Sequence, residues 1–228
     1  MDEDVQAAAA RLVRRLKEGG HTITVAESCT GGLLASSFTD IAGASLWFNQ
    51  SWVTYSNESK EKELNVNPET LESKGAVSAK VAIEMAQGAR ERADASLAIS
   101  ITGIAGPGND GTSKKVGMVY VGIASSTWAN AESTQIGGNR AENKIGFVHF
   151  ALLTAIRCYD KAMALQEESE RARDEAARAD AVAQAQFEIE RAKRDAATRE
   201  EAPWKDDEFV DGEAPEGAED AIDSDVEW

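Results

Sequence analysis

The sequence predicts an α/β fold: a three-layer α/β/α sandwich with a mixed, mostly parallel sheet, followed by a C-terminal helical extension and a disordered acidic tail. Three observations support this prediction. Strand-like and helical periodicities alternate through the first 163 residues, which is typical of a parallel sheet covered by helices. Two strand-like runs, 116–125 and 128–136, are separated by a short turn, so at least one strand is antiparallel. After residue 163 the composition changes to charged residues and alanine.

The charge is concentrated in the last part of the chain. The net charge of the 228 residues is −16, and residues 164–228 hold 22 Asp and Glu against 8 Lys and Arg. We therefore predict a domain over 1–163, a charged Ala-rich helical extension over 164–200 and a disordered acidic tail over 201–228. The tail is either a solubilising appendage or an arm that binds an unknown partner.

The composition also excludes several classes of function. No cluster of Lys and Arg is present, which argues against nucleic-acid binding. The N-terminus is acidic and no apolar run reaches the length of a membrane span, so we expect a cytoplasmic protein without a membrane partner. Two cysteines and two histidines without metal-site spacing predict no metal site, and we expect no cofactor.

The N-terminal elements follow from periodicity and capping. Apolar residues at helical spacing predict a helix over 4–18, and the β-branched run 22–26 predicts a strand that leads into a second helix. Residues 45–55 are aromatic and β-branched and predict another strand, which is followed by a short helix over 57–64.

The second half of the domain repeats this alternation. A helix is expected over 79–93, with Ser78 as its N-cap, and the apolar run 95–101 is typical of a central strand. A glycine-rich loop, 102–115, precedes the two strands of the predicted hairpin. A last helix begins near Arg140 and extends past the domain.

The turn after the first strand holds the first candidate site residue, Ser28. Thr30, Gly31 and Gly32 allow the backbone to turn sharply into the next helix. A serine hydroxyl at such a turn lies close to free backbone N–H groups, which suits a nucleophile that needs oxyanion stabilisation. From this segment alone, Ser28 is either a nucleophile or a helix cap, and Cys29 is either a second nucleophile or a packed cysteine.

Lys60 follows the end of the next strand, and the carboxyl ends of strands in such a sheet meet at one edge. Since neither histidine has a readable partner, a lysine kept neutral by burial is the expected general base for Ser28. Lys60 is alternatively an ordinary surface lysine. Ser59 and Lys62 match an S-x-x-K pattern, but they lie in a strongly charged helix and we interpret the match as chance.

The loop after the 95–101 strand matches G-x-G-x-x-G from Gly106 to Gly111, but a strand follows it where a dinucleotide site needs a helix. We expect instead either a substrate-enclosing loop whose amides contact phosphate or carboxylate groups, or an ordinary connection.

Six segments carry a resemblance to a known family: 26–32, 40–45, 53–60, 75–78, 102–107 and 114–120. Taken in order, they resemble the CinA C-terminal domain family over about residues 5–160. The resemblance implies a three-layer α/β/α fold and hydrolysis of nicotinamide mononucleotide to nicotinate mononucleotide and ammonia by a Ser–Lys pair, which falls on Ser28 and Lys60. Tyr55 and Thr102 lie in matching motifs and are expected to orient the site.

The expected substrate-binding residues come from the same motifs, and we also expect a homo-oligomer. Lys115 and the stretch Asn139 to Lys144 depart from the family pattern, in which a second arginine stands at the place of Lys144. The alternative function is therefore a catalytically inactive CinA-like module that binds a pyridine nucleotide or a protein partner. The substrate-binding candidates are Thr30, Gly31, Gly32, Gly103, Ala105, Gly106 and Arg140.

Overall fold

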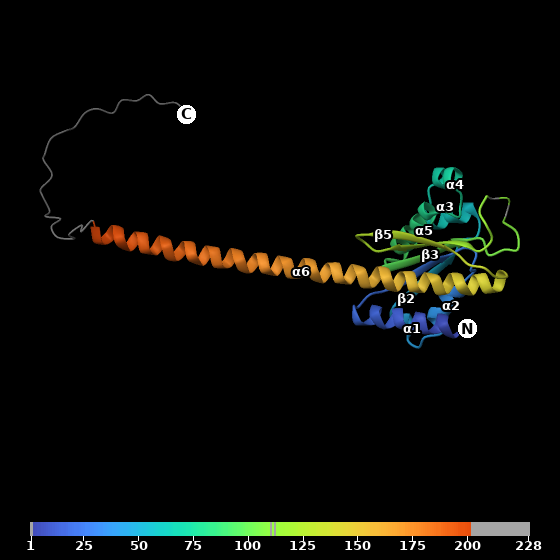
Figure 1. Ribbon diagram of the computed structural model, residues 1–228, viewed down its shortest axis with the longest axis horizontal. Coiled ribbons are helices and arrows are strands. Elements are labelled where there is room, and N and C mark those ends of the chain that lie inside the picture. The colour runs from blue at the N-terminus through green and yellow to red at the C-terminus, as the bar shows by residue number, and fades with distance from the viewer. Residues whose placement is uncertain (1, 110, 112, 202–228) are drawn as a thin grey trace, which may run out of the picture. The chain divides into compact units, whose positions relative to one another are not determined.

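The computed structural model describes residues 2–109, 111 and 113–201 (Figure 1). In this part of the chain five strands form one sheet in the order β2-β1-β3-β4-β5. β1 pairs in parallel with β2 and β3, whereas β4 pairs antiparallel with β3 and β5, so four of the five described strands run in one direction. The predicted mixed, mostly parallel sheet is thus confirmed. The strands are β1 (Ile23–Glu27), β2 (Phe48–Val53), β3 (Leu97–Gly103), β4 (Met118–Ala124) and β5 (Ala129–Gln135).

Helices cover both faces of this sheet (Figure 1). α1 (Glu3–Glu18), α2 (Leu33–Thr39) and the first turns of α6 (Arg140–Glu201) contribute to the larger apolar core. On the opposite face α3 (Asn57–Leu64), α4 (Pro68–Lys74) and α5 (Ala79–Ala93) enclose a smaller core. A short 3-10 helix, η1 (Ala44–Leu46), precedes β2, so the strand predicted over 45–55 is shorter than expected.

Side-chain alternation along the central strands separates the two cores. Val25, Ile99 and Ile101 pack in the larger core, whereas Ala26 and Ala98 pack in the smaller one. This period of two is the expected geometry of a strand. It also determines the site, because successive residues at the end of β1 must point to opposite faces of the sheet.

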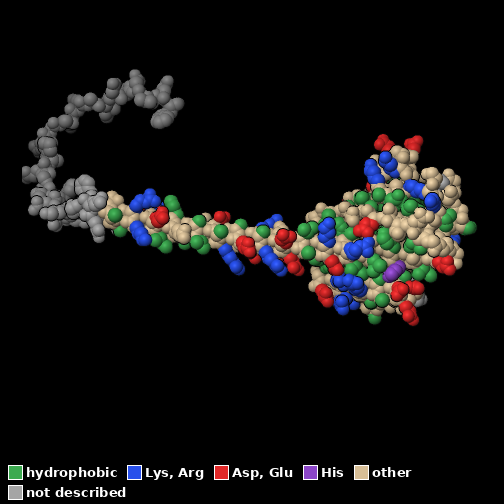
Figure 2. Space-filling view, in the orientation of Figure 1, with side chains coloured by type: hydrophobic (Ala, Val, Ile, Leu, Met, Phe, Trp, Pro, Cys, Tyr) green, Lys and Arg blue, Asp and Glu red, His purple; other side chains and the backbone are tan. Residues whose placement is uncertain are grey.

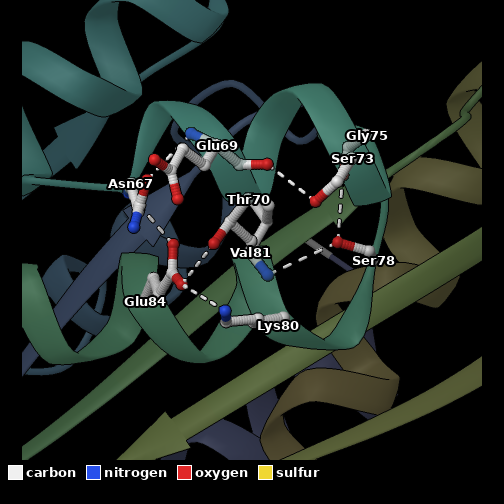
Figure 3. Close-up of polar contacts among 9 residues, drawn as sticks. All are labelled: Asn67, Glu69, Thr70, Ser73, Gly75, Ser78, Lys80, Val81 and Glu84. Carbon is white, nitrogen blue, oxygen red and sulfur yellow. Dashed lines mark hydrogen bonds and ion pairs between the residues drawn. The ribbon is translucent and has the colours of Figure 1, made fainter.

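One helix, α4, was not predicted from the sequence, although its capping signal is present. The Asn67 side chain accepts a hydrogen bond from the Glu69 N–H, and Pro68 occupies the first turn. Figure 3 shows how α4 is joined to α5: the Glu84 carboxylate accepts hydrogen bonds from the Asn67 N–H and the Thr70 hydroxyl. Leu71 is the only large apolar residue among the seven of this helix, so no apolar periodicity reveals it.

The chain divides into two compact units, residues 1–169 and the part from Glu170 onward. α6 includes the predicted extension over 164–200, and the side chains of residues 170–198 are all exposed. Figure 2 shows Lys, Arg, Asp and Glu side chains along this helix. The predicted disordered tail lies outside the described residues, apart from Glu201 at the end of α6. No described helix is both long and apolar enough to span a membrane.

Candidate active site

Ser28 lies in the turn between β1 and α2. Its N–H donates to the Ile101 carbonyl of β3 at 3.0 Å, and its carbonyl accepts from the Gly31 N–H at 3.1 Å. Gly31 and Gly32 have φ values of +64° and +97°, a conformation that side chains rarely adopt. The turn predicted from the two glycines is therefore present, and it leaves the Ser28 side chain 8% exposed.

Lys60 lies on α3, on the sheet face toward which Ser28 points. Its side chain is 1% exposed, and its Nζ lies 3.2 Å from the Ser28 Oγ. The same nitrogen donates to the carbonyl oxygens of Thr54 at 2.8 Å and Tyr55 at 3.1 Å. Among the described residues, no carboxylate lies within ion-pair distance of Lys60. Lys60 is thus not the surface lysine of the alternative interpretation.

Burial determines the protonation behaviour of this pair. It lowers the pKa of Lys60 from 10.5 to about 8, because the charged ammonium loses its hydration inside the protein. A neutral amine has two N–H donors and one lone pair, which match the two close carbonyls and the Ser28 hydroxyl. Lys60 is therefore placed to accept the Ser28 proton.

Cys29, beside the serine, is placed differently. Burial raises the pKa of its thiol to about 12, so the sulfur stays protonated at neutral pH. This agrees with a packed cysteine and not with a thiolate nucleophile.

Some backbone N–H groups near Ser28 already donate a hydrogen bond within the protein, whereas others have no acceptor among the described residues. The Gly31 N–H is engaged by the Ser28 carbonyl, and the Gly32 N–H by the Glu27 carboxylate. The Thr30 N–H donates no hydrogen bond to any of the described residues, and the buried Thr30 hydroxyl also has no partner among them. Of these three amides, that of Thr30 is the one free to bind an oxyanion.

Arg140, in the first turn of α6, joins two loops of the site. Its guanidinium donates to the Tyr55 hydroxyl at 2.9 Å and to the Gly106 carbonyl at 2.5 Å. Asn139 and Glu142 form a reciprocal cap that fixes the start of this helix. Tyr55 is 60% exposed, so its ring lies at the edge of the site and not in the core.

The other candidates support the surrounding loops. The Thr102 hydroxyl donates to the Ala76 carbonyl at 2.8 Å, which ties β3 to the loop before α5. The Ala105 carbonyl accepts from the buried Asn143 side chain at 3.0 Å. A Cβ added to Gly31 would lie 3.8 Å from the Lys144 Nζ, so this lysine of α6 lies over the Ser28 turn.

The sequence interpretation missed three groups that shape this site. The Thr54 carbonyl is the closest acceptor of the Lys60 amine. Every residue has a backbone carbonyl, so no sequence pattern identifies this one. Asn143 was noted only as a departure from a family pattern, yet its amide holds the loop after β3. Glu27 accepts three backbone N–H groups of the α2 start. An acidic residue just before a helix is its only sequence signal.

Known proteins are similar to about the first two thirds of the chain. A model of the CinA C-terminal domain family matches residues 5–159. Nicotinamide-nucleotide amidohydrolase PncC of Enterobacter agglomerans is 44% identical over 147 residues, which cover 64% of this chain and 90% of that protein. A putative competence-damage inducible protein of Acetivibrio thermocellus is 45% identical over 139 residues, covering 61% of this chain and 33% of the relative. The chain thus spans about a third of the length of the first curated relatives that it matches.

Solved structures share the fold of the larger compact unit, residues 1–169. The competence/damage inducible protein CihA from Agrobacterium tumefaciens superposes with a TM-score of 0.66 at 36% identity, covering 69% of this chain and 96% of that one. A CinA superfamily protein from Escherichia coli gives a TM-score of 0.63 at 36% identity, with coverages of 68% and 92%.

Proposed function

This chain belongs to the CinA C-terminal domain family, and from that membership and the site we propose that it is an amidohydrolase acting on nicotinamide mononucleotide. The products are nicotinate mononucleotide and ammonia. The observation that carries the proposal is the 3.2 Å contact between the Ser28 Oγ and the buried Lys60 Nζ. A relative named as a nicotinamide-nucleotide amidohydrolase supplies the substrate class.

In the first half of the reaction, the Ser28 Oγ attacks the carboxamide carbon while the neutral Lys60 amine takes its proton. The Thr30 N–H stabilises the negative charge that develops on the carbonyl oxygen. Lys60, now an ammonium ion, keeps its hydrogen bonds to the Thr54 and Tyr55 carbonyls and gives a proton to the departing nitrogen. The C–N bond breaks, ammonia leaves and an ester remains on Ser28.

In the second half, water attacks this ester. Lys60 is neutral again after the ammonia has left, so it accepts a proton from the water and returns one to the Ser28 oxygen. The C–O bond of the ester breaks, which releases nicotinate mononucleotide and regenerates the serine. The whole sequence consumes one water and requires no oxidant, reductant or metal.

Substrate binding is assigned to the loops around the pair. Arg140 and Lys144 are four residues apart on α6 and so share one helical face. Their positive charges suit the phosphate of the nucleotide, and Gly103 at the end of β3 and the loop up to Gly106 add backbone groups. Lys144 lacks the bidentate fork of an arginine, so it contributes as a point charge.

The test is ammonia release from nicotinamide mononucleotide by the full chain and four variants. We expect Ser28→Ala and Lys60→Met to lose at least about 1000-fold in kcat, because each removes one half of the nucleophile–base pair. Ser59→Ala and Lys62→Met are matched controls, since they change a serine and a lysine of α3 that lie within one turn of Lys60. Both controls should retain wild-type turnover.

Two outcomes would contradict the proposal in different ways. Undiminished release from Ser28→Ala would exclude the serine as the nucleophile. No release from the wild type, combined with measurable binding of the nucleotide, would favour the inactive binding module.

A further inference from the structure

Glu27 immediately precedes Ser28 but points to the other face of the sheet. It is the last residue of β1, its side chain is completely buried, and it lies on the side of α2 and the larger core. A buried carboxylate is costly unless strong hydrogen bonds compensate for its lost hydration. The partners of this carboxylate therefore indicate what it does.

All of the carboxylate's hydrogen bonds go to one short piece of backbone. The Glu27 Oε2 accepts from the N–H groups of Gly32 and Leu34, both at 3.1 Å, and Oε1 accepts from the Ala35 N–H at 2.8 Å. N–H groups at a helix start have no partner within the helix. Gly32, the N-cap residue of α2, has no side chain that would satisfy them.

These three hydrogen bonds hold the 28–32 turn, which carries Ser28, in place, and together we call them the clamp. At one end, the Ser28 N–H is held by the Ile101 carbonyl of β3. At the other end, Gly32 and the first turn of α2 are held by Glu27. Because Glu27 and Ser28 are covalent neighbours, the carboxylate closes a small loop around residues 28–32 and restricts where the serine hydroxyl can lie.

We infer that Glu27 is a positioning residue, which holds the 28–32 turn so that the Ser28 hydroxyl stays within reach of Lys60. It acts through the backbone and does not touch the substrate. This inference rests on the proposed function, in which Ser28 is the nucleophile. Glu27 also occupies the amides of Gly32, Leu34 and Ala35, whereas the Thr30 N–H has no acceptor among the described residues and stays available to the reacting oxygen.

The substitution Glu27→Gln tests the carboxylate with little change in shape. Its amide oxygen can replace Oε2 and accept from Gly32 and Leu34, but its NH2 group then faces the Ala35 N–H, and two donors cannot bond. The clamp loses one of its three bonds. Asp2→Asn is a matched control, because Asp2 also accepts two backbone N–H groups at a helix start, that of α1.

The readout is the reactivity of Ser28 itself, measured with an uncharged fluorophosphonate on the full chain. In this reaction the Ser28 oxygen forms a bond to phosphorus, fluoride leaves, and Lys60 accepts the serine proton. Mass spectrometry identifies the labelled residue and measures the rate of labelling. The reaction is run well below the unfolding temperature, so that the protein stays folded. We expect Glu27→Gln to label roughly 10- to 100-fold more slowly than wild type, since a misplaced nucleophile loses rate on this scale. Asp2→Asn should label at the wild-type rate.

A second measurement separates positioning from stability. In ammonia release, Glu27→Gln should lower kcat and leave KM for nicotinamide mononucleotide unchanged. Glu27→Asp, which keeps the charge but is one methylene shorter, should fall between wild type and Glu27→Gln in labelling rate.

A folded Glu27→Gln variant that labels as fast as wild type overturns the inference, because the carboxylate is then only a helix cap. If Glu27→Gln does not fold, the Glu27→Asp labelling rate decides in the same way. Wild-type protein that labels at Ser28 but releases no ammonia contradicts the proposed substrate and leaves the role of Glu27 standing. Wild-type protein with an unreactive Ser28 overturns both.

Discussion

The proton affinity of Lys60 leads to a quantitative prediction for the pH dependence of the reaction. Only the neutral amine can accept the Ser28 proton, and burial lowers the pKa of Lys60 to about 8. At pH 7 about one tenth of the molecules then carry a neutral Lys60, against about 0.03% for a lysine of ordinary pKa. The buried position therefore increases the population of the active form about 300-fold.

The direction of the pH profile follows from the sign of this shift. Below pH 8 Lys60 is mostly protonated, so kcat/KM should rise about tenfold per pH unit and level off above pH 8. Between pH 6 and pH 9 the neutral fraction increases from about 1% to about 90%, so we expect roughly a 90-fold rise. The assay is initial-rate ammonia release at constant ionic strength, since kcat/KM reports the free enzyme.

The substrate itself carries a group that titrates in this pH range, and its effect must be separated from that of Lys60. A phosphate monoester has a second pKa of about 6, so the substrate itself titrates at the acidic end of the range. The same profile should therefore be measured as the rate of Ser28 labelling by the uncharged fluorophosphonate. Lys62→Met, which removes an exposed lysine of α3, serves as the control and should reproduce the wild-type midpoint.

Two results would refute this reasoning. A flat profile between pH 6 and pH 9 would mean that Lys60 is not the base whose protonation limits the rate. A unit slope that continues beyond about pH 9.5 would mean that burial does not lower the pKa of the lysine as its position requires.

Four further predictions concern stability and substrate binding. The folded-state pKa of Lys60 lies below its unfolded value of 10.5, so the unfolded chain binds more protons between pH 8 and 10.5 and stability rises with pH there. The measurement is the unfolding free energy in denaturant for the wild type minus that for Lys60→Met. This difference should increase by about 3 kcal/mol from pH 8 to pH 10.5. A difference that stays constant over this range would contradict the lowered pKa. Arg140→Ala should raise KM for nicotinamide mononucleotide roughly tenfold or more, with a smaller effect on nicotinamide riboside, and equal losses for both would exclude a phosphate contact. Asn143→Val should lower the unfolding free energy by roughly 1–3 kcal/mol, because two carbonyls that accept from the side chain lose their donor, and an unchanged melting curve would refute this. Removal of residues 170–228 should leave kcat and KM unchanged, because the candidate site lies within residues 1–169, and a folded but inactive product would contradict it.

Much of the fold was predictable because its signals are local. The α5 helix has the predicted bounds and cap, since the Ser78 hydroxyl accepts from the Val81 N–H within one turn. The 57–64 helix and the hairpin of β4 and β5 were also predicted from neighbouring residues. α4 was missed, because a short helix with a cap and few apolar residues gives no periodic pattern.

The candidate site was predictable only in part. Ser28 and Lys60 were placed at neighbouring strand ends, and the structure brings their side chains to 3.2 Å. The sequence predicts free N–H groups near Ser28 but not which ones they are, and the Gly31 N–H is bonded to the Ser28 carbonyl. A hydrogen bond between two residues of a turn depends on its dihedral angles, which the presence of glycine permits but does not specify.

By itself, the sequence determined the order of the strands and of the helices other than α4, the glycine turn at Ser28, and the contrast between a near-neutral first part of the chain and an acidic C-terminal part. These depend on interactions over a few residues or on composition. Only the tertiary structure decided that Lys60 is buried against the Thr54 carbonyl, that its pKa is lowered, and that Glu27 clamps the turn from the opposite face. The physical reason is that desolvation and hydrogen bonding depend on how β1, β2 and α3 pack around these groups, and pairing between segments distant in the chain is not encoded in the periodicity of either segment.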